Sequence, residues 1–319
     1  MAHDQGLSNL IYGALYGVAA GDALGAPLEF MSASQIAHAH GTVRDMLSGG
    51  WLNVKPGEIT DDTQMTVAVA QGILDDPEHP VEAAGKHFLD WYATNPKDVG
   101  VTCSMSIHQA KSLAKQADQK LPNEEDWKIA SEDTHQATNG KSAGNGTLMR
   151  TVYVGLYYTH EEEIKKHAMG LSAMTHHDPQ AGQACAAYCL VISALLNNPG
   201  RETLVEELER VKPLIPYYDY RKLTDPCFKP IPSGYVVESF KAALHAILTT
   251  ATFEDALVKA INLGGDADTI GAIAGGLAGA LYGKDQIPQR WLDSLLKTSA
   301  GYMARLDAFA EAAIKKRLS

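Results

Sequence analysis

The sequence has little cysteine, no excess of basic charge and no long apolar run. Only four residues are cysteine: Cys103, Cys185, Cys189 and Cys227. They form no paired framework, so a disulfide-stapled scaffold is not expected and a reducing cytoplasm is favoured. The net charge of −11 argues against a nucleic-acid-binding protein, which usually carries a basic patch. The first residues lack the basic region of a signal peptide, and the apolar run at 270–282 is shorter than the ~20 residues of a membrane span.

Alternating strand patterns are also scarce, and helical periodicity dominates the chain. An opening helix has an apolar face from Leu7 to Val18, with Ser8 as its predicted N-cap. Residues 151–158 are the one tempting strand, but we predict helix there because the segment follows a glycine loop within a helical array. Further helices are predicted at 63–74, 81–92, 164–174, 181–196, 237–248 and 270–281, with one or two more over 291–315. No linker divides the chain, so one all-α domain over residues 1–319 is predicted.

Two smaller features bear on function. Cys185 and Cys189 lie one helical turn apart, a spacing that suits a soft metal, although buried thiols on an apolar helix explain it better. Proline is concentrated at 212–232, a segment too long for an idle connector, which we predict to be a lid or a binding loop.

Two short acidic clusters each precede an apolar helix. In the first, Thr60 is a predicted N-cap, which places Asp61 and Asp62 in the first turn of the buried helix. Acids in a first turn also complement the helix dipole, so this cluster alone has a plain structural explanation. The second cluster holds Asp266 and Asp268, followed by Thr269 and a helix of small residues that is able to pack very close to a neighbour.

Carboxylates at two buried helix starts are hard to explain as solvated caps. Ionised carboxylates in an apolar setting are costly and normally pair, take up a proton or bind metal. Few cationic side chains lie near either cluster in sequence. Four aspartates and two threonines form an all-oxygen set that suits Mg²⁺, Mn²⁺ or Ca²⁺ and disfavours zinc and copper. We therefore predict that close helix packing brings the clusters together around two ions ~4 Å apart.

Several segments now resemble the ADP-ribosylglycohydrolase family. These are residues 21–30 (GDALGAPLEF), 59–63 (ITDDT), 143–146 (AGNG), Met149-Arg150 and 264–269 (GGDADT). They occur in the family's order over nearly the whole chain. Other stretches resemble its bacterial dinitrogenase-reductase-activating glycohydrolase branch: 49–52 (GGWL), 96–100 (PKDVG), Thr175-His176 with Pro179, and 234–237 (GYVV).

The resemblance implies a compact orthogonal bundle of helices and a centre of two divalent cations, Mg²⁺ or Mn²⁺. It also implies hydrolysis of the N-glycosidic bond between ADP-ribose and a modified arginine, which reverses mono-ADP-ribosylation. On the matching positions, the metal ligands are Thr60, Asp61, Asp62, Asp266, Asp268 and Thr269. All six are present, which argues against a degenerate member.

Two carboxylates match family positions for proton transfer. We favour Asp98 as the acid/base group near the guanidinium, with Glu29 as the alternative. Without the resemblance, Glu29 would be a surface cap and Asp98 a turn residue after Pro96. Asp22 is expected to brace the metal site without binding the metal.

The substrate-binding predictions also depend on the resemblance. The loop containing Gly144, Asn145 and Gly146 is expected to offer backbone N–H groups to a diphosphate. His176 is expected at a phosphate or ribose, with a structural role as the alternative. Tyr235 is expected to stack on adenine, with core packing as an equal alternative. Arg150 either neutralises phosphate or forms an internal ion pair.

The expected partners follow from the same resemblance. They are ADP-ribose, an ADP-ribosylated protein such as the nitrogenase iron protein, and a signal-transduction regulatory protein, with the enzyme itself a cytoplasmic monomer. Three other functions are alternatives: hydrolysis of a serine-linked or other ADP-ribose derivative, a non-catalytic ADP-ribose-binding or crystallin-like protein, and a prenyl-diphosphate synthase. The last needs a third acid at helical spacing, where this chain has Met65.

Overall fold

The structure is a computed structural model that describes residues 2–319, of which about 70% are helical. The α-helices are α1 (Ala2–Gly25), α2 (Ala33–His40), α3 (Asp61–Asp75), α4 (Pro80–Ala93), α5 (Val101–Gln116), α6 (Glu124–Ala137), α7 (Val152–Tyr157), α8 (Glu161–Ala173), α9 (Pro179–Asn197), α10 (Arg201–Arg210), α11 (Tyr220–Leu223), α12 (Val236–Leu248), α13 (Phe253–Ile261), α14 (Ala267–Tyr282), α15 (Gln289–Thr298) and α16 (Ala300–Leu318). Three short 3-10 helices are η1 (Ala26–Leu28), η2 (Asn145–Arg150) and η3 (Lys284–Gln286). Between residues 2 and 319 there is no strand, only three isolated bridges. The all-α prediction is confirmed.

Every predicted helix is present, including the ambiguous segment 151–158, which forms α7. Residues 291–315 form two helices, α15 and α16. The predicted N-cap of the opening helix is wrong, because α1 begins at Ala2 and Ser8 lies inside it. The prediction also missed six helices: α2, α5, α6, α10, α11 and α13.

The longest helix–helix contact joins α1 to α14 along their lengths. Glycines recur every fourth residue on α1 and face small residues of α14, in the pairs Gly13–Gly279, Gly17–Gly275, Gly21–Gly271 and Gly25–Ala267. A Cβ at Gly17 would overlap the carbonyl oxygen of Gly275, so only glycine permits this backbone approach. The pairing is antiparallel, and it places the end of α1 beside the start of α14.

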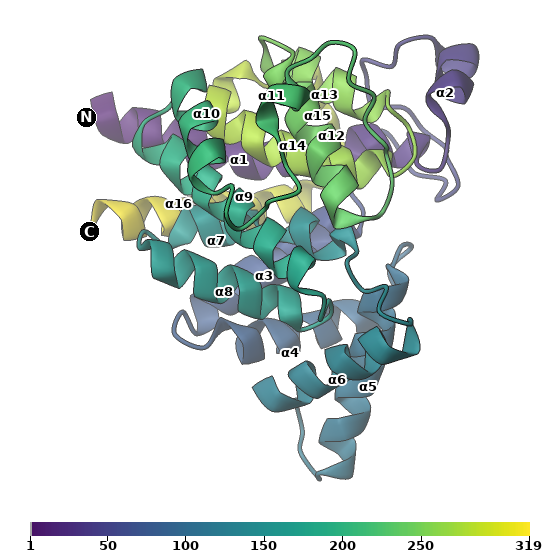
Figure 1. The fold of residues 1–319 in the computed structure, drawn as a ribbon, viewed down its shortest axis with the longest axis vertical. Coiled ribbons are helices and arrows are strands. Elements are labelled where there is room, and N and C mark those ends of the chain that lie inside the picture. Colours follow the sequence, from purple (N-terminus) through teal and green to yellow (C-terminus); the bar gives the residue numbers. More distant parts are fainter. Residues whose placement is uncertain (1) are drawn as a thin grey trace.

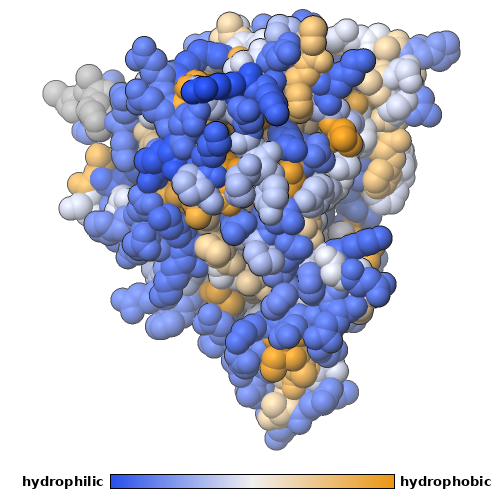
Figure 2. Space-filling model, in the orientation of Figure 1, coloured by the Kyte–Doolittle hydropathy of each residue, from blue (hydrophilic) through white to orange (hydrophobic). Residues whose placement is uncertain are grey.

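Other helices surround this central pair (Figure 1). Helices α12 and α13 pack on α14, while α4, α5 and α6 form the narrow lower end of the view in Figure 1. The two chain ends lie on the same side of the molecule. One cluster of buried apolar side chains extends from Leu7 to Ala313. Figure 2 shows that hydrophilic residues predominate on this face, in keeping with the net charge of −11.

Helix α9 and the proline-rich segment 212–232 differ from or extend the sequence-based predictions. Among the described helices, α9 is long and apolar enough to cross a membrane, and the prediction overlooked it in favour of residues 270–282. Of its most apolar window, 78% is buried inside the protein, as expected of a core helix. The proline-rich segment 212–232 contains the short helix α11, and the carbonyl oxygen of Leu223 accepts a hydrogen bond from His245 Nδ1 at 2.7 Å. Its role as a lid stays a prediction.

Candidate active site

Asp22, near the end of α1, fixes the first turn of α3. Its carboxylate accepts hydrogen bonds from the backbone N–H of Thr60 at 3.0 Å and of Thr63 at 3.1 Å. It also accepts from the Thr60 hydroxyl at 2.8 Å and the Thr63 hydroxyl at 2.5 Å. The prediction that Thr60 is the N-cap of α3, with Asp61 and Asp62 in the first turn, is confirmed. The Thr60 side chain makes no capping hydrogen bond to the helix, because its hydroxyl donates to Asp22. Asp22 caps α3 from the neighbouring helix and so orients Asp61 and Asp62.

A backbone pairing brings Glu29 to the start of α14. Gly264 and Gly265 have φ angles of 73° and 64°, and a side chain at Gly265 would overlap the carbonyl oxygen of Pro232. The Phe30 N–H donates to the Gly265 oxygen at 2.7 Å, and the Gly265 N–H donates to Met31 at 2.7 Å. This pairing lays the segment after α1 against the residues that begin α14.

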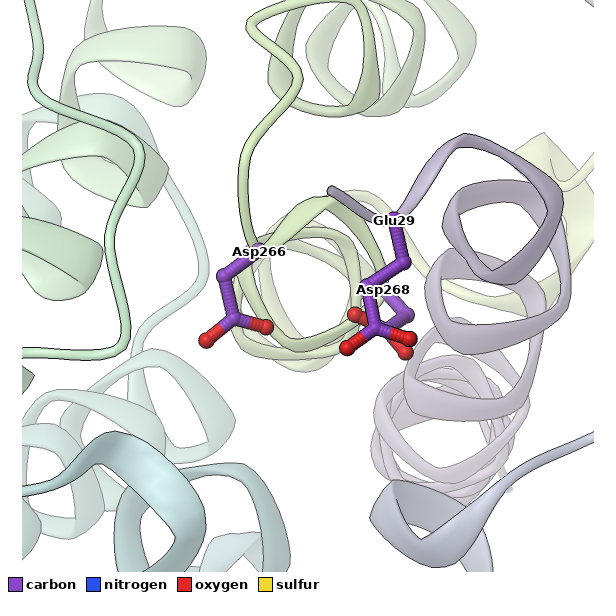
Figure 3. A group of neighbouring side chains, drawn as sticks. All are labelled: Glu29, Asp266 and Asp268. Atoms are coloured by element: carbon purple, nitrogen blue, oxygen red, sulfur yellow. The ribbon is translucent and has the colours of Figure 1, made fainter. Parts of the chain in front are cut away.

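As a result, Glu29, Asp266 and Asp268 form one carboxylate group. Each offers an oxygen, and these oxygens all lie within 4.8 Å of one another. Figure 3 shows the three carboxylates directed toward a common space beside the first turn of α14. Asp61, from the first acidic cluster, lines the same cavity as Glu29 and Asp266. The prediction that helix packing brings the two clusters together is confirmed. Helix α1 contacts both α3 and α14, and α3 and α14 also contact each other directly.

Burial and mutual repulsion disfavour ionisation of these acids. Burial, followed by the charges of Asp22 and Asp61, raises the pKa of Asp62 well above its usual range. Burial and neighbouring carboxylates likewise raise the pKa values of Asp61 and Asp268. Burial raises the pKa of Glu29 to about 8, against the hydrogen bond from Trp51.

Within residues 2–319, no basic side chain forms an ion pair with these carboxylates. The acidic group consists of Asp22, Glu29, Asp61, Asp62, Asp98, Asp266 and Asp268. Within residues 2–319 none of its members forms an ion pair, and the adjacent Lys97 pairs with Glu58 at 2.5 Å instead. Asp62 Oδ1 is buried with no hydrogen-bond partner. An all-oxygen set with an orphaned buried oxygen and no counter-charge fits a hard divalent cation.

The acidic group lies on a cavity of about 470 Å³, a typical volume for a small-molecule site. Most of the predicted site residues line it: Glu29, Asp61, Asp98, Gly144, Asn145, Gly146, His176, Asp266 and Thr269. Asp62, Thr60 and Asp268 are buried beneath the lining. Tyr235 does not line the cavity.

The glycine loop at 144–146 is tied to the acidic group through Asn145. The Asn145 side-chain amide donates to Asp266 Oδ2 at 2.7 Å and to the Ser239 hydroxyl at 2.9 Å. Its backbone N–H donates to the Gly234 oxygen at 2.9 Å, so this N–H is already used. Asn145 therefore orients Asp266, and any backbone donors for an anion must come from other residues of the loop.

His176 and Arg150 form a second buried polar group beside this loop. The Arg150 guanidinium is fully buried and donates to the Thr175 hydroxyl at 2.9 Å and to the Leu171 oxygen at 3.2 Å. The Thr175 hydroxyl is in turn 2.8 Å from His176 Nδ1. Burial and the charge of Arg150 lower the pKa of His176 to about 3, so its imidazole is neutral. The sequence predicted either phosphate neutralisation or an internal ion pair for Arg150. Its guanidinium is internal, but it forms no ion pair within residues 2–319.

The remaining predicted residues have clear positions. Asp98 lies in the loop between α4 and α5, as expected, and burial raises its pKa. Tyr235 is 41% exposed, which excludes core packing, and its hydroxyl donates to Gln180 Oε1. Cys185 and Cys189 are buried in α9, and the Cys185 sulfur lies 3.5 Å from the Thr147 and Thr151 hydroxyls.

Sequence reasoning gave no role to two aromatic residues at the cavity. Trp51 Nε1 donates to Glu29 Oε2 at 2.5 Å, and Phe30 lines the cavity next to it. Both fall within motifs that were recognised, 21–30 and 49–52. The signal available was an aromatic residue directly after a candidate catalytic acid.

Comparison with known proteins gives this acidic, all-helical site a class. Residues 3–318 match the ADP-ribosylglycohydrolase family. The chain is 33% identical to the ADP-ribosyl-[dinitrogen reductase] glycohydrolase of Rhodospirillum rubrum, over 96% of this chain and 95% of that one. It is 28% identical to the ADP-ribosylarginine hydrolase Tri1 of Serratia proteamaculans, over 89% of this chain and 75% of that one.

A solved structure agrees with these sequence matches. It is described as an ADP-ribosylglycohydrolase-related protein complex and superposes with a TM-score of 0.76 at 28% identity, over 97% of this chain and 99% of that one. The chain belongs to the ADP-ribosylglycohydrolase family, a family of hydrolases.

Proposed function

We propose that the protein hydrolyses the N-glycosidic bond between ADP-ribose and a modified arginine side chain of a protein. Membership of the family and the names of the two relatives support this reaction. The observation that carries the proposal is the acidic group: four of its carboxylates line one cavity, three more are buried, and no basic side chain pairs with them within residues 2–319. A structural role alone does not explain so much uncompensated buried charge.

In this proposal the acidic group holds two divalent cations, Mg²⁺ or Mn²⁺. The ligands are Thr60, Asp61, Asp62, Asp266, Asp268 and Thr269. The orphaned Asp62 oxygen and the all-oxygen donor set support the assignment. When bound, such ions orient ribose hydroxyls and lower the pKa of a water molecule. Asp22 and Asn145 keep the ligand carboxylates oriented through hydrogen bonds to the first turn of α3 and to Asp266.

The glycine loop and His176 bind the diphosphate and ribose. A Cβ at Gly144 would lie 2.9 Å from His176 Nε2, so glycine lets the loop approach this imidazole. Because its imidazole is neutral, His176 contributes a hydrogen bond rather than a charge. Tyr235 lies outside the cavity but pairs through its backbone with Gly144, within reach of an adenine that extends beyond the loop.

Asp98 carries the proton in this proposal. It lines the cavity but does not belong to the group of three carboxylates that Glu29 joins. Glu29 is thus placed to face the cations, whereas Asp98 is free to accept a proton from water or to return one to the departing guanidine. Burial raises the pKa of Asp98, which favours its protonated form.

The setting of the reaction is proposed on the same basis. We expect a single-domain monomer in the cytoplasm, with an ADP-ribosylated protein such as the nitrogenase iron protein as substrate and a signal-transduction protein as regulator. The continuous hydrophobic core supports the single domain. The name of the R. rubrum relative supports the candidate target.

The test uses a peptide that carries ADP-ribose on arginine. With Mn²⁺ or Mg²⁺ we expect release of free ADP-ribose, measured by mass spectrometry, and we expect a chelator to stop it. Metal-independent release would contradict the metal assignment. Release only from ADP-ribosylserine or poly-ADP-ribose would contradict the arginine linkage, and no release from any of these would contradict hydrolysis.

A further inference from the structure

Phe30 combines an exposed side chain with a left-handed backbone conformation, which its hydrogen bond to Gly265 holds in place. Its side chain is 68% exposed, although it is a large apolar ring. Its backbone φ is 64°, a left-handed conformation in which a bulky residue is a genuine outlier. Backbone strain of this kind is unfavourable and clusters at functional sites. The strained, exposed ring directly follows Glu29.

Trp51 completes an aromatic pair at the edge of the cavity. The Phe30 and Trp51 rings have centroids 5.3 Å apart at an interplanar angle of 43°, and Trp51 is 53% exposed. Backbone hydrogen bonds of 2.8 and 2.9 Å between Gly49 and Val54 close the turn that carries Trp51. Both rings line the acidic cavity together with Asp98.

Phe30 also borders a second cavity. This cavity, of about 740 Å³, lies between the segment after Phe30 and the proline-rich segment 226–232. Phe30 therefore borders both cavities.

We propose that Phe30 and Trp51 form an aromatic seat for the guanidinium of the ADP-ribosylated arginine. The inference rests on the proposed function and adds residues that recognise the cationic part of the substrate. A guanidinium is planar, weakly hydrated and positively charged, and it stacks on aromatic faces. The carboxyl groups of Glu29 and Asp98 line the same cavity and offer oxygen acceptors to the guanidinium N–H groups beside the rings.

Phe30 is the residue to vary, because Trp51 also donates a hydrogen bond to Glu29 and its loss would disturb that carboxylate. Phe30→Leu keeps an apolar side chain and the same backbone requirement but removes the π face. Phe30→Tyr keeps the π face and is the matched control. We expect kcat/KM for an arginine-linked ADP-ribosyl peptide to fall about 3- to 30-fold in Phe30→Leu and to stay near wild type in Phe30→Tyr.

Calorimetric binding of ADP-ribose serves as the second readout. We expect its Kd to be unchanged in both variants, because the seat contacts the arginine and not the nucleotide. The inference is overturned if Phe30→Leu has the same kcat/KM as the wild type, or if both variants lose kcat/KM equally. It is also overturned if Phe30→Leu loses affinity for ADP-ribose in parallel with kcat/KM. If the wild type releases no ADP-ribose from the arginine-linked peptide, the proposed function fails together with the inference, whereas normal wild-type release with an unaffected Phe30→Leu overturns the inference alone.

Discussion

Two buried charged regions lie beside one cavity and are stabilised in opposite ways. The Arg150 guanidinium is surrounded by neutral groups: the Thr175 hydroxyl, the Leu171 carbonyl and the Phe88 ring, whose centroid is 4.6 Å away. The acidic group is surrounded largely by its own members, and Asp62 Oδ1 has no partner. The fold thus supplies hydrogen-bond and ring contacts to the buried guanidinium, although its Nε has no partner, whereas the carboxylates lack the charge that would balance them.

The difference shows what each region does. Arg150 connects η2 to the end of α8 and holds Thr175 against His176, so its charge serves the structure. In the acidic group, the hydrogen bonds to Asp22 and Asp266 do not balance the charge, and a buried charge without a counter-charge destabilises the folded state. Substitution of one charged residue at a time should therefore change the stability of the protein in opposite directions in the two regions.

The largest effect is expected for Asp62→Asn. This change removes one charge and keeps the shape of the side chain. We expect activity on the arginine-linked peptide to fall about 1,000-fold or more, because a cation ligand is lost. In the metal-free state we expect the variant to be more stable to urea than the wild type, because a repelling charge is gone. Retained activity, or a metal-free variant less stable than the wild type, would count against the assignment.

Asp98→Asn should separate proton transfer from metal binding. We expect kcat to fall about 100- to 10,000-fold, the usual contribution of a general acid or base. Bound Mn²⁺, measured by calorimetry, should be unchanged. Glu29→Gln is the comparison variant, and we expect it to weaken Mn²⁺ binding. A wild-type rate in Asp98→Asn would transfer the proton-handling role to Glu29.

Arg150→Met should have the opposite sign to Asp62→Asn. The substitution leaves the Thr175 hydroxyl and the Leu171 carbonyl without their donor. We expect the free energy of unfolding to fall by about 2–4 kcal/mol, because each unsatisfied buried group costs about 1–3 kcal/mol. Urea denaturation measures the change, with Arg150→Lys as the variant that keeps the charge but loses the planar fork. An unchanged midpoint in Arg150→Met would show that these bonds contribute nothing.

The smallest effect is a pH dependence of stability in the metal-free protein. The pKa of Glu29 rises from 4.5 to about 8 on folding, so the folded state holds its proton more tightly than the unfolded chain. The stability gained from this proton is fully present below pH 4.5, the pKa of Glu29 in the unfolded chain, and is lost as pH rises through about 8. We expect the melting temperature of metal-free protein to fall across this range and Mg²⁺ to reverse most of the loss. A melting temperature that rises with pH here would be inconsistent with uncompensated carboxylates.

The two acidic clusters were the most predictable part of the candidate site, and the contact between Phe30 and Trp51 the least. Asp61, Asp62, Asp266 and Asp268 precede strongly apolar helices, so local pattern placed them at helix starts. The four-residue spacing of Gly13, Gly17, Gly21 and Gly25 also predicts the close contact with α14. It does so only when it is considered together with the small residues at the same spacing on α14. The capping of α3 by Asp22 depends on that contact and is not visible in either segment alone.

The missed helices and loops have a physical explanation. Helices α5 and α6 bury only a few residues each and are largely polar, so their apolar periodicity is weak. The position of Phe30 follows from its hydrogen bond to Gly265, a partner more than two hundred residues away. Pairings of this kind leave no periodic signal in the sequence.

The central claim is that the acidic group binds divalent cations. Equilibrium dialysis of the metal-free protein against Mn²⁺, with bound ion counted per chain and Asp268→Asn as the matched variant, tests it directly. We predict two ions per wild-type chain and a clear loss of binding in Asp268→Asn. Wild-type protein that binds no Mn²⁺, or a variant that binds as well as the wild type, would contradict the claim.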